Sequence, residues 1–150
     1  MATVESSIDV NVDLTTAYNQ WTQFESFPQF MENVKSVHQL DDRRLRWVAE
    51  IGGQTREWDA EIVEQIPDQR IAWSSVSGEP NGGIVTFQSL GDTTTKVHLR
   101  MEYEPQGLLE SAGDLLGVVD RQVKGDLERF KRFIESRGEE TGSWRGTIAV

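Results

Sequence analysis

The sequence predicts an α+β fold in which a curved antiparallel sheet is covered by one long C-terminal helix. Two patterns predict it. Between residues 34 and 103 apolar and polar residues alternate, and turn-forming residues recur at about every tenth position. From residue 108 to residue 136 the apolar residues lie three or four positions apart, as on one face of a helix. A sheet with one apolar face must be covered, and this helix is the segment large enough to cover it.

The first predicted element is a strand at the N-terminus. Over residues 3–12, four valine and isoleucine side chains fall on one face and polar side chains on the other. The apolar set is Val4, Ile8, Val10 and Val12. This alternation is typical of a half-buried strand.

Two short helices are expected after this strand. Asp13 can accept hydrogen bonds from the first free amides of a helix that runs to about Phe24. Pro28 suits a first helical turn, so a second short helix is expected around it. That helix would bear three apolar side chains, those of Phe27, Phe30 and Met31.

The central segment predicts an antiparallel meander of short strands. Its expected turns lie at Asp41-Asp42, Gly52-Gly53, Pro67-Asp68, residues 77–83 and Gly91-Asp92. Short strands joined by tight turns pair with their neighbours along the chain. Pro105 and Gly107 then end the meander.

The long helix is predicted from Leu108 to Ser136, about 40 Å at 1.5 Å per residue. Its apolar stripe is Leu108, Ala112, Leu115, Leu116, Val119, Val123, Leu127, Phe130 and Ile134. We therefore expect one ligand-binding domain over residues 1–138. Residues 139–150 form a C-terminal tail for which two arrangements are open: an extended strip on the body of the domain, or a frayed end.

Composition argues against several classes of function. A formal net charge of −10 would repel a phosphate backbone, so we expect no nucleic-acid partner. The chain has no cysteine and only two histidines, His38 and His98, so no metal site and no cofactor is expected. No stretch approaches the ~18 apolar residues of a membrane span, and the N-terminus does not resemble a signal peptide. We expect a cytoplasmic protein.

The alternation assigns each strand residue to one face of the sheet. The apolar face collects Trp47, Ala49, Ile51, Trp58, Ala60, Ile62, Ile71, Trp73, Ser75, Val85, Phe87, Val97, Leu99, Met101 and Tyr103. Glu57, Asp59 and Glu61 fall on the opposite face with His98, where solvent and nearby basic residues offset their charge. The carboxylates of this strand are therefore expected in solvent and not at a catalytic site. His38 fits either face.

Four segments and the order of the elements are similar to those of one known superfamily. The segments are AYNQWTQFESFPQFMENVKSV (17–37), REWDAEIVEQIPDQRIAW (56–73), GGIVTF (82–87) and VKGDLERFKRFIE (123–135). They resemble the START-like (SRPBCC) superfamily, in particular its polyketide cyclase/dehydrase and lipid-transport family. This resemblance implies a helix-grip fold with a deep pocket for an apolar small molecule. It carries over no catalytic residue, because no single catalytic motif defines the group.

Three functions compete. The first is binding of a hydrophobic small molecule, such as a lipid, quinone or polyketide, between the sheet and the long helix. The second is a cyclase or dehydratase, which needs an acid or base at the bound substrate. The third is a protein-interaction module in which the tail docks a partner through Trp144. The apolar face contains no charged residue, which favours binding without catalysis.

The candidate ligand-binding residues come mainly from the apolar sheet face. Tyr103 and Ser75 would provide its polar groups, and Phe30 and Leu116 would lie near the mouth. The full predicted set is Phe30, Trp58, Trp73, Ser75, Phe87, Leu99, Met101, Tyr103 and Leu116. No catalytic and no metal-binding residue is predicted.

Overall fold

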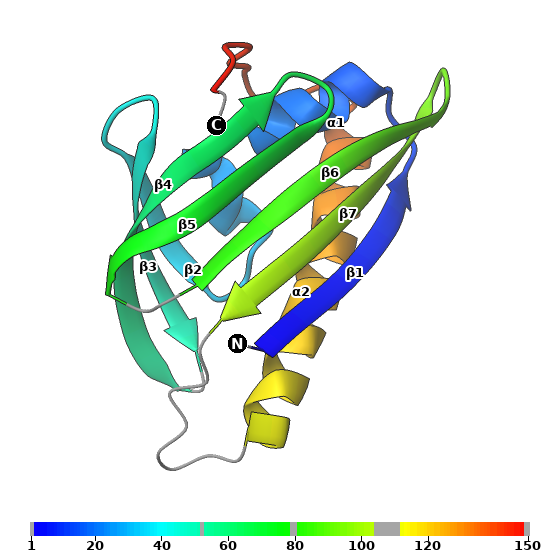
Figure 1. The fold of residues 1–150 in the computed structure, drawn as a ribbon. Helices are drawn as coiled ribbons and strands as arrows, with labels where there is room; N and C mark the ends of the chain where they lie inside the picture. Colours follow the sequence, from blue (N-terminus) through cyan, green and yellow to red (C-terminus); the bar gives the residue numbers. More distant parts are fainter. Residues whose placement is uncertain (1, 52, 79–80, 104–111, 149–150) are drawn as a thin grey trace.

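A curled antiparallel sheet packs against one long C-terminal helix, and two short helices follow the first strand (Figure 1). This computed structural model describes residues 2–51, 53–78, 81–103 and 112–148. The predicted α+β fold class is confirmed. In the described part of the chain, no helix is both long enough and apolar enough to cross a membrane.

The N-terminal segment contains strand β1 (Ala2–Val10), helix α1 (Leu14–Trp21) and the 3-10 helix η1 (Phe24–Gln29). Asp13 caps α1 as predicted, since its carboxylate accepts bonds from the Thr16 amide at 3.4 Å and hydroxyl at 2.5 Å. Pro28 lies inside η1, which ends before Phe30 and Met31. Both short helices exist, although each is shorter than the sequence predicted.

The central segment forms the six predicted strands. They are β2 (Val34–Gln39), β3 (Arg44–Ile51), β4 (Gln54–Ile66), β5 (Arg70–Gly78), β6 (Asn81–Gly91) and β7 (Thr94–Tyr103). Each pairs antiparallel with the next. β1 pairs with β7, so the sheet order is β1-β7-β6-β5-β4-β3-β2. Asp68, with φ of 63°, makes the tight turn between β4 and β5.

Helix α2 (Ala112–Arg137) lies along the inner face of the sheet (Figure 1). Its side chains at Val123, Leu127, Phe130 and Ile134 are buried, as the apolar spacing predicted. The predicted start at Leu108 lies outside the described residues. Phe130 contacts the rings of Trp21 and Phe30, with centroids 5.3 and 5.2 Å away, so α2 and the short helices share one aromatic core.

The C-terminal tail is bonded to α1 and to the end of β4. Ile148 exchanges two backbone hydrogen bonds with Gln65, at 2.7 and 2.9 Å, and its side chain is buried. The backbone amide of Trp144 donates to the Thr22 hydroxyl at 3.0 Å, and its ring packs against the core. Residues 139–148 thus lie on the protein's own surface, and these contacts give Trp144 an intramolecular role.

Candidate functional site

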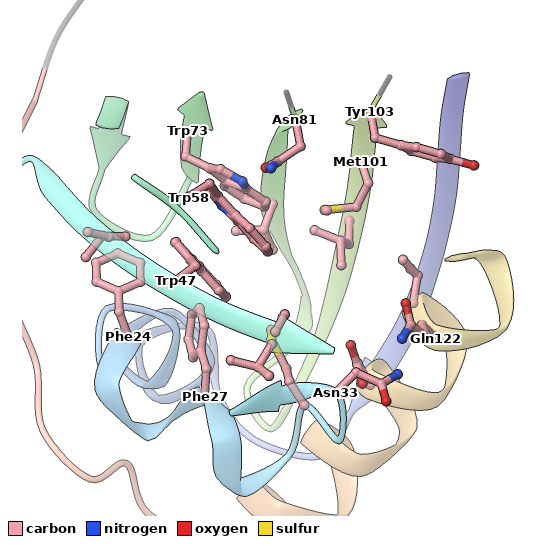
Figure 2. Close-up of a pocket in the computed structure, with 18 of the residues that line it drawn as sticks. Phe24, Phe27, Asn33, Trp47, Trp58, Trp73, Asn81, Met101, Tyr103 and Gln122 are labelled. Atoms are coloured by element: carbon pink, nitrogen blue, oxygen red, sulfur yellow. The ribbon is translucent and has the colours of Figure 1, made fainter. Parts of the chain in front are cut away.

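A cavity of about 170 Å³ lies between the inner face of the sheet, η1 and α2 (Figure 2). Strands β3, β4, β5, β6 and β7 provide one wall, and Val119 and Val123 of α2 provide part of the other. Most of its lining is aromatic or aliphatic, because the sheet residues facing inward are those of the alternating apolar set. A concave, largely apolar space of this kind is typical of a small-molecule site.

Tryptophan rings form a continuous aromatic wall on one side of the cavity. Trp47 and Trp58 are direct partners across β3 and β4, and their rings stack with centroids 5.8 Å apart and planes at 7°. Trp73 lies above them on β5 (Figure 2). A Cβ at Gly83 would be 2.6 Å from the Trp73 ring, so glycine is required for the ring to lie against β6.

Five of the nine predicted residues line this cavity: Trp58, Trp73, Leu99, Met101 and Tyr103. Figure 2 shows the thioether of Met101 pointing inward and the Tyr103 hydroxyl pointing toward β1. Leu116 lies in α2, but its side chain is outside the described residues.

The other three predicted residues are placed outside the cavity lining. Phe30 is 1% exposed and packs in the aromatic core against Phe130. The ring of Phe87 meets Tyr18 edge-on at 5.4 Å, because α1 covers this part of β6. The Ser75 hydroxyl accepts a hydrogen bond from the Asn81 amide at 3.0 Å, which uses it in the β5–β6 connection.

Polar side chains that the sequence did not single out complete the wall: Asn33, Arg56, Asn81, Gln122 and Asp126. Arg56 could have been found, since it has the same parity in β4 as Trp58. Gln122 and Asp126 lie one turn apart at the edge of the apolar stripe of α2. Apolar spacing alone gave no signal for them.

Among the titratable groups of the described residues, Asp126 has a strongly altered pKa. Burial raises the pKa of its carboxyl from 3.8 to about 6, although the Arg129 guanidinium lies 2.5 Å away and opposes this change. Arg129 also donates to the backbone oxygen of Phe30 at 3.0 Å and pairs with Glu32 at 3.1 Å. This cluster joins α2 to the loop between η1 and β2.

The carboxylates of β4 lie on the outer face, as the alternation predicted. Arg46 pairs with Glu57 at 2.9 Å and with Asp59 at 2.8 Å. His98 lies 3.1 Å from Glu5 on the same face, and His38 is exposed. Among the described residues, no three His, Asp or Glu side chains are grouped to hold a metal ion.

A second hollow, open to solvent and of about 320 Å³, adjoins the cavity. We call it the polar groove; its lining is Glu32, Asn33, Glu50, Gly53, Arg121, Gln122 and Arg129. Asn33 and Gln122 line both spaces. Figure 2 shows these two amides at the edge of the cavity formed by α2 and the loop before β2.

Comparison with known proteins gives consistent matches over nearly the whole chain. The model of the family described as polyketide cyclase/dehydrase and lipid transport matches residues 10–132. An uncharacterised 17.2 kDa protein of Streptomyces lincolnensis is 56% identical over 149 residues, which is 99% of each chain. This relative provides no activity to compare.

Two solved structures illustrate the shared fold. A START superfamily protein from Mycobacterium smegmatis superposes with a TM-score of 0.81 at 16% identity, covering 90% of this chain and 98% of that one. The Zhui aromatase/cyclase from Streptomyces sp. R1128 gives a TM-score of 0.77 at 15% identity, covering 95% and 99%. At these identities the likeness concerns the fold.

Proposed function

The chain belongs to the polyketide cyclase/dehydrase and lipid transport family, and we propose that it binds a compact apolar molecule in the cavity between the sheet and α2. The observation that carries this proposal is the enclosed aromatic wall of Trp47, Trp58 and Trp73 opposite Val119 and Val123. A flat apolar ring placed there gains burial and offset stacking.

The cavity volume favours a ring compound over a long acyl chain. An apolar cavity of roughly 150 Å³ is large enough to hold benzene. The space of about 170 Å³ described above therefore fits a small aromatic molecule, such as a quinone or a single-ring or fused-ring polyketide fragment. A full-length acyl chain would exceed this volume.

Tryptophan fluorescence provides a direct test with naphthalene as the probe. We expect saturable quenching, because the probe would contact Trp47 and Trp58. Ala49 is 3% exposed and lines the cavity, so Ala49→Leu fills part of the space and should weaken binding. Ala72 lies in β5 on the opposite face of the sheet, and Ala72→Leu adds the same volume outside the cavity. Equal binding by both variants, or no saturation with the unmodified protein, would refute the proposal.

A second candidate function, a cyclase or dehydratase, is favoured by one observation. Asp126 lines the cavity and has a carboxyl pKa raised to about 6, which suits proton transfer near neutral pH. Such an enzyme would use Asp126 to move a proton on a bound hydroxyketone that loses water. Mass spectrometry tests this activity by detecting the loss of water from a hydroxyketone that has been incubated with the protein. Equal product formation by wild type and Asp126→Asn would eliminate it.

A further inference from the structure

The polar groove suggests what kind of ligand the cavity holds. We propose that the ligand is amphipathic, with an apolar ring in the cavity and a carboxylate in the polar groove beside Arg121. This inference rests on the proposed function, since the apolar part must first occupy the cavity. It adds a head-group site built from Asn33, Gln122 and Arg121.

The cavity and the polar groove share two lining residues. The amide side chains of Asn33 and Gln122 line the apolar cavity and the polar groove alike. A ligand of the proposed kind would place its ring against Trp47 and Trp58 and its substituent beside these amides. Their N–H groups would donate to oxygen atoms of that substituent.

Most charged side chains of the groove have an ion-pair partner. Glu50 is paired with Lys35 at 3.0 Å, and Arg129 is paired with Glu32 and Asp126 at 3.1 and 2.5 Å. Arg121 lines the groove, and none of the residues described in the structure forms an ion pair with it. The groove thus places two amides beside Arg121, a cation without an ion-pair partner among the described residues, and these three groups together suit a carboxylate.

The wall of the groove is held in place by hydrogen bonds within the protein. The backbone oxygen of Asn33 accepts a hydrogen bond from the Glu50 amide at 2.7 Å. On the other side, Arg129 holds the backbone oxygen of Phe30 at 3.0 Å. The loop carrying Asn33 is therefore fixed to β3 and to α2, so little ordering is required when the head group binds.

The negative net charge of the chain opposes the binding of a carboxylate anywhere except beside a local cation. The whole chain carries a formal charge of −10, which disfavours any anion approaching its surface. A preference for an acid over its neutral analogue must therefore come from a local cation. Of the two arginines in the groove, Arg129 is already paired with Glu32 and Asp126, so this cation is Arg121.

The test compares naphthoate with the neutral naphthamide, which has nearly the same shape. Both are titrated against the full-length protein by tryptophan fluorescence at low ionic strength. We expect naphthoate to bind about fivefold more tightly, near the upper end of what one exposed ion pair provides. The preference should fall as salt is added, because the charges at the groove are exposed.

Two matched variants separate a local effect from a general one. Arg121→Gln should bring the ratio of the two dissociation constants close to one. Arg132→Gln removes the same charge from an exposed position of α2 outside the groove and should keep the ratio. If wild type binds both probes equally, or both variants lose the preference alike, the head-group site is refuted while cavity binding stands. If neither probe binds, the proposed function itself fails.

Discussion

Neighbouring residues of β4 have opposite environments because side chains alternate across a sheet. Trp58 is 9% exposed and stacks on Trp47, whereas Glu57 and Asp59 face solvent and pair with Arg46. The alternation in the sequence predicted this arrangement correctly. Because Glu57 and Asp59 lie on the outer face, they cannot act as acid or base on a ligand in the cavity.

Substitutions in β4 should show this difference. Replacing Glu57, Asp59 and Glu61 together by glutamine should barely shift the urea midpoint, since exposed ion pairs stabilise little. Trp58→Ala should lower the free energy of unfolding by about 3 kcal/mol or more, because a buried ring is lost. Equilibrium urea unfolding and naphthalene titration of both variants measure this. Loss of binding in the folded triple variant would place the carboxylates inside.

Asp126 lines the cavity, although the sequence pattern did not predict it there. The spacing of the apolar residues in α2 does not indicate which of the residues between them become buried, yet Asp126 borders the cavity. Which residues at the edge of an apolar stripe become buried depends on how far the helix is rotated against the sheet. That rotation is set by tertiary packing, here through Arg129 and the loop before β2.

The raised pKa of Asp126 predicts a specific pH dependence. The folded protein holds this proton more tightly than the unfolded chain, so ionised Asp126 destabilises the fold. The penalty is absent below pH 3.8 and complete above about pH 6. The stability of Asp126→Asn relative to wild type should therefore rise across this window and then stay level.

Urea unfolding at several pH values measures the difference in the free energy of unfolding between Asp126→Asn and wild type. The other carboxyl groups contribute equally to both proteins, so their effect drops out of this difference. NMR titration of the Asp126 carboxyl provides an independent value. A difference that does not change with pH, or a carboxyl that titrates near 3.8, would contradict the assignment.

At the scale of elements, the tail explains polar residues that α1 buries. Gln20 is fully buried, and its side chain exchanges hydrogen bonds with Thr141 at 2.9 and 3.0 Å. Arg145 reaches Asn19 at 2.7 Å and Asp68 at 2.9 Å. The alternation and helical spacing predicted each element, but they did not identify which segment covers which. For the same reason Phe87 was predicted to line the cavity, whereas its ring is covered by α1.

Removal of the tail should therefore destabilise the protein. Ile148 is 3% exposed, so Ile148→Ala should cost about 2–4 kcal/mol, and deletion of residues 139–150 at least as much. Val76 is 46% exposed, and Val76→Ala serves as the control with little expected change. Thermal and urea unfolding measure the stability of wild type, the deletion variant, Ile148→Ala and Val76→Ala. A deletion variant as stable as wild type would instead favour a tail that docks another protein.

At the scale of the whole molecule, the order of elements determines where the cavity forms. The sequence predicted the curved sheet, the covering helix and the aromatic wall, because each depends on residue spacing along one element. The polar edge at Asn33, Gln122 and Asp126 was not predicted, since it forms only where η1, β2 and α2 meet. The function that we propose depends on the apolar space between these elements.

A crystal structure with bromonaphthalene bound would test that claim most directly, because bromine gives an anomalous signal at its own position. We expect one strong peak inside the cavity, between Trp58 and Met101 of the sheet and Val123 of α2. Bromine found only on the outer surface, with side chains filling the space between the sheet and α2, would contradict the account.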